Sequence, residues 1–164
     1  MEKGVPSNFV VGLGVGLGAG VFIGMLLAAK SGRERSDAIR ENPNRLWKEI
    51  VRWTRALVAT HNKAFGKNIF VNPPQEDTAS SRIEVHRPVF PIAKLTLWRK
   101  SAYVFSFSIE RAESSFAHSK YSKGRMEVMP DNKRNLYVVF EDGTRLPTPQ
   151  AVAEHLLEPI FFGI

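Results

Sequence analysis

An uncharged, apolar run of 21 residues near the start of the chain constrains its fold more than any other feature. Residues 9–29 read FVVGLGVGLGAGVFIGMLLAA, and as an α-helix they would be about 31 Å long, close to the ~30 Å hydrocarbon core of a bilayer. Four glycines recur in it at every fourth position: Gly12, Gly16, Gly20 and Gly24. Glycine weakens a helix in water by about 1 kcal/mol per residue, whereas in lipid it lets a second helix approach closely. The run therefore predicts a transmembrane helix that self-associates through its glycines.

The distribution of charge predicts the orientation of this span. The net charge of +7 is concentrated directly after the apolar run: residues 30–67 contain ten Lys or Arg against four Asp or Glu, whereas residues 68–164 contain twelve against eleven. Basic residues next to a span resist translocation. We therefore expect the N-terminus outside and residues 30–164 on the cytoplasmic side.

Three other interpretations of the apolar run stay open. A secretory signal peptide has a basic start, a shorter apolar core and a small-x-small cleavage site, which fit this run poorly. Residues 14–19 also satisfy the loose G-x-G-x-x-G/A dinucleotide fingerprint, as closely spaced glycines readily do. Several glycine-rich spans could also assemble into a pore. A membrane span explains the length of the run best.

The segment that follows the apolar run resembles the YtxH-like family. Residues 26–35 read LLAAKSGRER, where that family pairs a glycine-rich span with a motif of the type LLAPKSGKETR; the chain departs from it at Ala29 and at residues 35–36. The resemblance implies a single-pass bacterial envelope protein, loosely linked to stress responses, and supplies no catalytic residues. Independently, Lys30, Arg33 and Arg35 are expected at the membrane interface, where basic residues are attracted to anionic headgroups.

A basic amphipathic helix is expected after this boundary. Asn42 and Pro43 form a typical helix start, and apolar residues follow at helical spacing up to a stop at Gly66. Trp47 and Trp53 lie in this helix, which either rests in the membrane interface or packs on the remaining domain or on its own copy. Residues 31–67 thus form a juxtamembrane helical region, and residues 68–82 a linker.

Residues 83–164 predict a small β-rich domain. Apolar side chains alternate from 102 to 109, and residues 125–129 and 135–141 resemble a hairpin. Thr148 and Pro149 begin a short helix that Pro159 is expected to end. The sequence thus predicts an α+β fold: a transmembrane helix, a basic amphipathic helix, and a small antiparallel sheet of four or five strands closed by a C-terminal helix.

No catalytic, metal-binding or cofactor-binding residues are predicted. The chain has no cysteine, and its four histidines show no metal-ligand spacing. His155 with Glu154 and Glu158 is expected to form a solvated helix face. The basic tract of Lys120, Lys123 and Arg125 is interspersed with acidic residues, so nucleic acid is not an expected ligand.

The leading hypothesis is a non-enzymatic, single-pass membrane protein. Its expected partners are the bilayer, a second copy that packs through the span, and a protein not identified by the sequence. The alternative hypothesis is a membrane-tethered enzyme or ligand-binding module with its site on the β domain.

Alkaline-carbonate extraction tests the predicted span. Membranes that carry the full chain should retain it, because a transmembrane helix resists extraction, whereas a chain that begins at Lys30 should be released. A protease-protected C-terminal tag in sealed spheroplasts would confirm the orientation. Release of the full chain would contradict the prediction.

Overall fold

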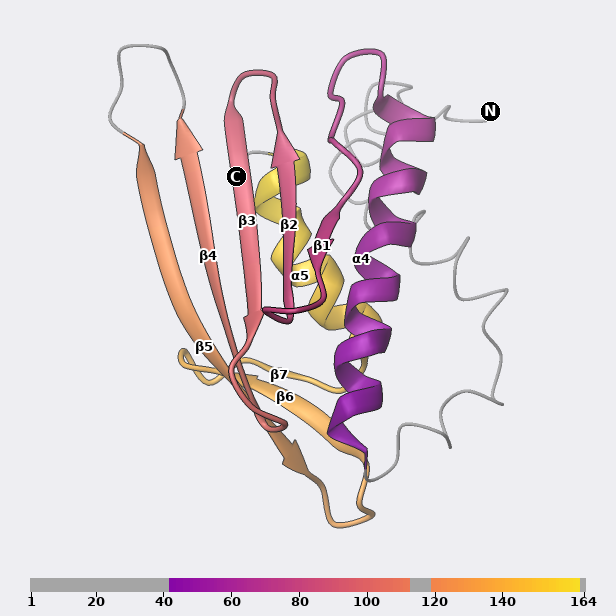
Figure 1. Ribbon diagram of the computed structural model, residues 1–164, viewed down its shortest axis with the longest axis vertical. Helices are drawn as coiled ribbons and strands as arrows, with labels where there is room; N and C mark the ends of the chain where they lie inside the picture. Colours follow the sequence, from indigo (N-terminus) through magenta and orange to yellow (C-terminus); the bar gives the residue numbers. More distant parts are fainter. Residues whose placement is uncertain (1–41, 113–118, 163–164) are drawn as a thin grey trace, which may run out of the picture. The chain divides into compact units, whose positions relative to one another are not determined.

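The computed structural model describes residues 42–112 and 119–162, which all belong to one compact unit of the chain (Figure 1). The predicted span 9–29 lies outside the described residues, and none of the helices within them is long and apolar enough to cross a membrane. The described unit has two helices and one antiparallel sheet, which confirms the predicted α+β class and C-terminal helix.

The sheet is a meander of seven strands in sequence order. The strands are β1 (Gln75–Asp77), β2 (Arg82–Arg87), β3 (Ile92–Arg99), β4 (Val104–Ala112), β5 (Lys120–Pro130), β6 (Leu136–Phe140) and β7 (Arg145–Leu146). Four or five strands were expected. The additional strands are the short edges, because β1 forms within the segment expected to be a linker and β7 contains only two residues. Neither has enough residues to show alternation in the sequence.

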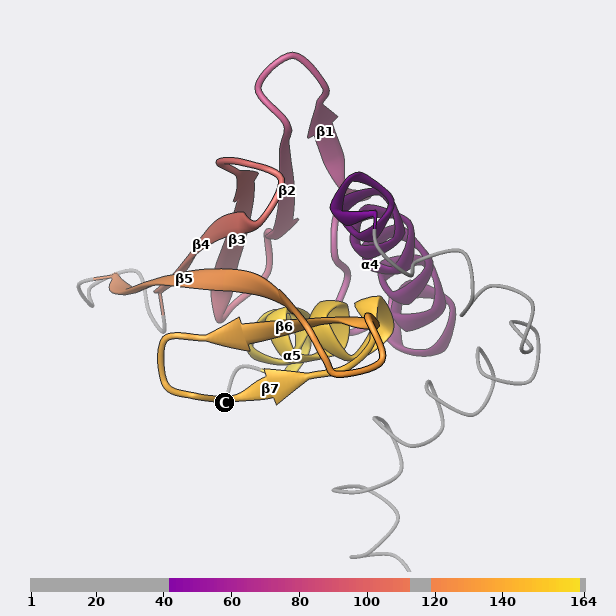
Figure 2. The same ribbon diagram turned by 90° about the horizontal axis from the view of Figure 1, so that it is seen from below.

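Strand β5 belongs to both halves of the sheet. Residues 120–127 pair with β4, and residues 126–130 pair with β6. Figure 2 shows β5, β6 and β7 turned across the wall formed by β1 to β4, with helix α5 (Pro149–Phe162) inside the resulting angle. We call the face toward α5 the core face and the opposite one the outer face.

Helix α4 (Pro43–Phe65) begins as the sequence predicts. The Asn42 side chain accepts hydrogen bonds from the backbone N–H groups of Asn44 and Arg45, at 3.0 and 3.4 Å, and Pro43 occupies the first turn. These bonds satisfy donors that a helix start leaves without partners. Gly66 closes the other end through its N–H, which donates to the Asn62 carbonyl at 2.9 Å.

The apolar side of α4 packs inside the domain. Trp47 and Trp53, expected at the membrane interface if the helix lay there, are only 5% and 8% exposed. The Trp47 ring lies 5.4 Å from that of Phe105 on β4, and α4 packs against α5. Because burying an aromatic side chain contributes roughly 1.5–3 kcal/mol, the packed position stabilises the fold and leaves neither tryptophan available to lipid.

One contiguous core fills the space between the helices and the core face. Alternate residues of each central strand contribute to it, as in the burial pattern of β2, where every second residue is buried. The largest fully buried apolar side chains are Phe105, Leu46, Ile50, Leu57, Ile83, Leu95, Leu97, Met126, Leu156, Leu157 and Ile160.

Helix α5 extends past the proline that was expected to end it. Pro159 lies inside α5, which continues to Phe162. A proline removes one backbone hydrogen bond and disfavours a helix interior. Here the last turn is held from outside, because Ile160 and Phe161 are buried and their carbonyls accept hydrogen bonds from Arg87 at 3.3 and 3.1 Å.

His61 of α4 is a fully buried titratable group. Its ring stacks on that of Phe161, with 4.2 Å between ring centroids, and its Nε2 lies 2.9 Å from the Ile69 carbonyl oxygen. A carbonyl can only accept, so Nε2 carries the proton and Nδ1 is left buried without a partner. Burial lowers the pKa of His61 below 6.5, an effect to which the charge of Arg87 adds and which the Ile69 carbonyl opposes.

The lowered pKa of His61 predicts a pH-dependent stability. The unfolded chain binds a proton at this site near pH 6.5 while the folded chain resists it, so the free energy of unfolding should fall as pH drops below 6.5. Urea unfolding of the full chain in detergent, at about pH 7.5 and about pH 5.5, measures this loss. His61→Gln should reduce the loss, whereas His155→Gln, at an exposed position, should not. Equal losses in all three proteins would contradict the assignment.

Candidate functional site

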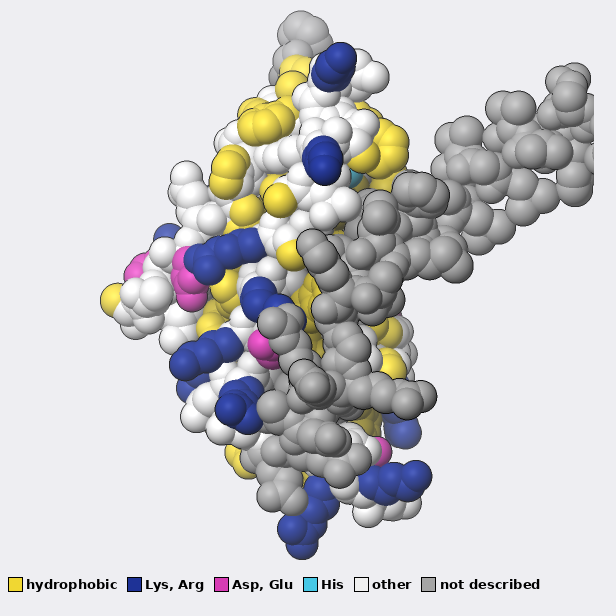
Figure 3. Space-filling model, turned by 90° about the vertical axis from the view of Figure 1, so that its right-hand side faces the viewer, with side chains coloured by type: hydrophobic (Ala, Val, Ile, Leu, Met, Phe, Trp, Pro, Cys, Tyr) yellow, Lys and Arg dark blue, Asp and Glu magenta, His cyan; other side chains and the backbone are white. Residues whose placement is uncertain are grey.

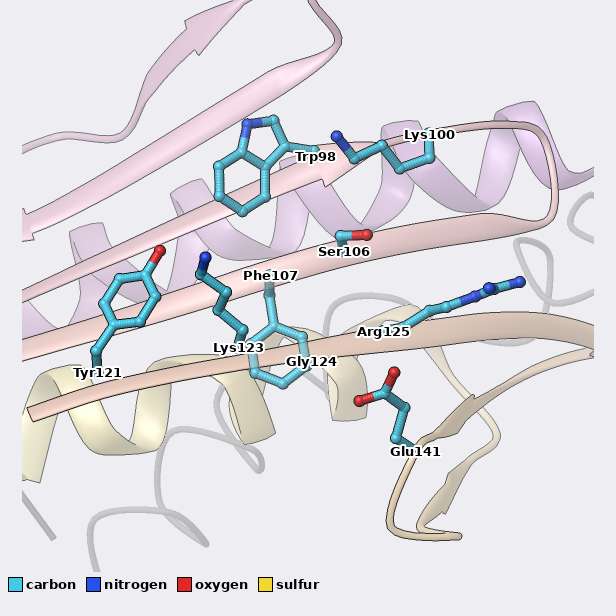
Figure 4. Close-up of a pocket in the computed structure, with 9 residues that line it drawn as sticks. All are labelled: Trp98, Lys100, Ser106, Phe107, Tyr121, Lys123, Gly124, Arg125 and Glu141. Atoms are coloured by element: carbon cyan, nitrogen blue, oxygen red, sulfur yellow. The ribbon is translucent and has the colours of Figure 1, made fainter.

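A groove on the outer face of the sheet is the main candidate site. We call it the sheet groove; it has a volume of about 480 Å³ and extends across β3, β4 and β5 to the end of β6 (Figure 4). Ligand sites commonly enclose about 300–1,000 Å³, so its size suits a small ligand or a short peptide segment. Its lining residues are Trp98, Lys100, Ser106, Phe107, Tyr121, Lys123, Gly124, Arg125 and Glu141.

Strand register brings these side chains together from distant parts of the sequence. Trp98 pairs with Ser106 across β3 and β4, and Ser106 pairs with Arg125 across β4 and β5. Because side chains two residues apart share a face, Tyr121, Lys123 and Arg125 project on the same side of β5. Figure 4 shows Tyr121 and Lys123 side by side below the Trp98 ring, with Arg125 farther along the strand.

The floor of the sheet groove depends on a glycine. A Cβ atom at Gly124 would lie 2.4 Å from the ring of Phe107, its partner on β4, so any other residue there would force the ring to move. The Phe107 ring therefore packs directly against the backbone of β5, and also lies 5.8 Å from the Phe140 ring. This contact supports the groove from the core face.

Two lysines in the groove place their ammonium groups over aromatic rings. The ammonium of Lys123 lies 4.9 Å from the Tyr121 ring centre, and that of Lys100 lies 5.6 Å from the Trp98 ring centre. Such contacts contribute about 0.5–1 kcal/mol at exposed sites. Neither lysine forms an ion pair with any carboxylate in the described part of the chain. Both charges are therefore available to an anionic group that enters the groove.

The remaining charges make the groove moderately positive. Arg125 forms an exposed ion pair with Glu127 at 2.9 Å, and Glu141 is the one acidic residue that lines the groove itself. Exposed ion pairs contribute little stability, so a ligand carboxylate or phosphate could compete for Arg125 at low cost. The arrangement suits non-covalent binding of an acidic ligand that also contacts the two aromatic rings.

A second hollow lies on the core side, beside α5. It has a volume of about 390 Å³ and is lined by apolar side chains such as Ile109 and Phe140, together with Asp142, His155 and Glu158. The His155 ring meets the edge of Phe140 at 4.8 Å. The Thr144 backbone N–H and hydroxyl, with a smaller effect of His155, lower the pKa of Asp142.

His155, Glu154 and Glu158 were expected to form a solvated helix face, and two of the three side chains are exposed while Glu154 is half-buried. Glu154 accepts a hydrogen bond from the Gln150 amide at 2.9 Å. Throughout residues 42–112 and 119–162, no three His, Cys, Asp or Glu side chains are grouped so that they could hold a metal ion.

Of the residues that the sequence singled out for packing in the membrane or at its interface, only Trp47 and Trp53 lie within the described part of the chain. Gly12, Gly16, Gly20 and Gly24, with Lys30, Arg33 and Arg35, lie outside the described residues. Trp47 and Trp53 are buried in the core of the domain and do not line the sheet groove.

Sequence reasoning did not identify the sheet groove. Lys123 and Arg125 were noted only as parts of a diluted basic tract, whereas Trp98, Lys100 and Tyr121 were not singled out. The available signal was the alternation of Tyr121, Lys123 and Arg125, which places all three on one face of a strand. Their partners on β3 and β4 follow only from the register.

The chain matches no protein-family model, no curated protein and no solved structure in the three comparisons made. The resemblance of residues 26–35 to the YtxH-like family stays a prediction. The geometry of the domain and the sequence that precedes it are therefore the guides to function.

Proposed function

We propose that the protein is a single-pass, membrane-anchored interaction protein. Residues 9–29 anchor it and self-associate through Gly12, Gly16, Gly20 and Gly24, while the domain described above lies on the cytoplasmic side and binds another protein. The resemblance to the YtxH-like family supports a bacterial inner membrane and a role in stress. The glycine spacing and the basic residues that follow the span support the anchoring and the orientation.

The observation that carries the binding function is the sheet groove. It places two aromatic rings, two lysines without carboxylate partners and Arg125 on one open surface. Aromatic residues and arginine are enriched where proteins bind one another, since they offer large contact areas together with polar groups. An acidic segment of a partner protein fits this combination, because its carboxylates can replace water around Lys100 and Lys123.

Binding, rather than chemical transformation, matches the exposure of the groove. Tyr121, Lys123 and Arg125 are all exposed, so water reaches the charged groups. Catalytic acids and bases are typically tuned by burial and by neighbouring charges. Reversible recognition needs only the complementary charges and rings that this surface presents.

Photocrosslinking in native membranes tests the groove as a binding surface. A benzophenone amino acid in place of Tyr121 should give a discrete protein adduct in cells that express the full chain. Tyr103 is the matched control position, because its exposure of 53% is close to that of Tyr121, 55%, while it lies in the turn between β3 and β4. The double substitution Lys100→Glu and Lys123→Glu should remove the adduct, since it reverses the charges that attract an acidic segment.

Three outcomes would contradict the proposed binding function. They are the same adduct from position 103, an adduct that persists after charge reversal, and an adduct whose partner is nucleic acid. Lys133→Glu, at an exposed site in the turn before β6, should leave the adduct unchanged and so excludes a general effect of charge.

A further inference from the structure

One end of the domain gathers most of its exposed apolar side chains. Of the eight large hydrophobic side chains that are exposed among the described residues, five lie in segments that meet at the end where α4 terminates. We call this group the aromatic end: Phe65, Phe70, Val89, Phe90 and Phe162. An exposed cluster of this kind typically marks a contact surface, because single exposed apolar residues are usually scattered.

Ring contacts and hydrogen bonds bring the three contributing segments together. The ring of His61 lies 5.4 Å from Phe65 and 6.4 Å from Phe162, which joins the ends of α4 and α5. Arg87 donates to the carbonyls of Phe90 and Phe161, both at 3.1 Å, which joins the turn between β2 and β3 to α5. The segment around Phe70 is fixed by the Asn62 side chain, which accepts from the Val71 N–H at 2.9 Å.

The segments that form the aromatic end also contain no acidic residue; the nearest one in sequence is the exposed Glu158, directly before Pro159. These segments are residues 61–71, 86–94 and 159–162, and Lys63 and Lys67 are exposed beside the phenylalanines. Figure 3, in which this end lies at the top, shows hydrophobic side chains next to Lys and Arg and no acidic side chain on the visible face there. Exposed aromatic rings flanked by lysines complement a surface whose outer layer is negatively charged and whose interior is apolar.

The chain between span and domain is long enough for this end to face the membrane. Residues 30–41 link the predicted span to Asn42, and twelve residues reach roughly 40 Å when extended. Helix α4, with 23 residues, is about 34 Å long, so the link can pass the whole helix when it is extended, in place of the helix that the sequence predicts over these residues. The C-terminal end of α4 can therefore reach the bilayer that the predicted span crosses, although it is the first turn of α4 that follows the span in sequence.

We propose that the aromatic end docks on the anionic surface of a lipid bilayer. This inference rests on the proposed anchoring, since it assigns the docked surface to the membrane that residues 9–29 cross. Phe65, Phe70, Phe90 and Phe162 enter the boundary between headgroups and acyl chains, and Lys63 and Lys67 meet lipid phosphates. Docking holds the domain close to the membrane and fixes the direction in which the sheet groove faces.

A second copy of the chain is a poorer occupant of this surface. Two aromatic ends brought together would place four lysines side by side, and like charges repel where solvent is excluded. The anionic bilayer supplies the opposite charge over the whole area of contact. Charge complementarity therefore selects lipid.

Depth-sensitive fluorescence on the full chain tests the docking. Since the chain contains no cysteine, Phe90→Cys and Tyr103→Cys each provide a single labelling site for an environment-sensitive fluorophore. The two positions are matched in exposure, 52% and 53%, and lie at opposite ends of β3. The labelled chains are reconstituted into vesicles of phosphatidylcholine alone, or of phosphatidylcholine mixed equally with phosphatidylglycerol.

In the anionic vesicles, the label at 90 should shift to shorter emission wavelength and be quenched by spin-labelled lipid, whereas the label at 103 should show neither change. High salt, or the double substitution Lys63→Glu and Lys67→Glu, should abolish the shift at 90, because both weaken attraction to the anionic surface. The pair Lys48→Glu and Lys133→Glu changes the net charge equally at exposed sites outside the aromatic end and should preserve it.

The failures of the two proposals are distinguishable. If the full chain is stripped from the vesicles by alkaline carbonate, the anchoring itself is wrong. If the chain stays in the bilayer but the label at 90 behaves like the label at 103, only the docking is overturned. A shift at 90 that depends on protein density and is not quenched by lipid would also overturn it, because it would identify a second copy as the occupant.

Discussion

The rest of the domain depends on the hydrogen bonds that the Arg87 guanidinium donates. It is buried and donates to the carbonyls of Ile160 and Phe161 in α5 and to that of Phe90 in the turn after β2. Burial, with the nearby charge of Arg111, lowers the pKa of Arg87, but a guanidinium stays protonated in proteins. Its positive charge meets the negative end of the helix dipole, where the last carbonyls of a helix would otherwise lack donors.

This arrangement explains how one small sheet presents two separate surfaces. Alternation along the strands directs apolar side chains to the helices and leaves Trp98, Tyr121 and Lys123 on the outer face, where they form the sheet groove. The aromatic end arises where α4, α5 and the turn after β2 terminate together, and Arg87 and His61 hold those ends in place. We propose that one surface faces the bilayer and the other a protein.

Local signals in the sequence predicted the elements, and long-range contacts determined the surfaces. Asn42 and Pro43 marked the start of α4 because a cap and a proline act within one turn. The end of α5 was wrongly placed at Pro159, because the donor that stabilises its last turn comes from Arg87, 73 residues earlier than Ile160. The sheet groove was missed for the same reason: Trp98 and Lys123 meet only through the pairing of three strands. The positions of Trp47 and Trp53 indicated an amphipathic helix, but they did not indicate which surface its apolar face would pack against.

Hydrogen exchange on the full chain in detergent micelles, comparing Arg87→Lys with the wild type, tests the central role of Arg87 most directly. Lysine keeps the positive charge, but it lacks the planar guanidinium with which Arg87 donates to three carbonyls. Amide protection should fall in residues 156–162 and 86–93, while the hairpin of β5 and β6 stays protected. Arg82→Lys, on the same strand but on the outer face, should behave as the wild type. Unchanged protection at the end of α5 in Arg87→Lys would contradict the account.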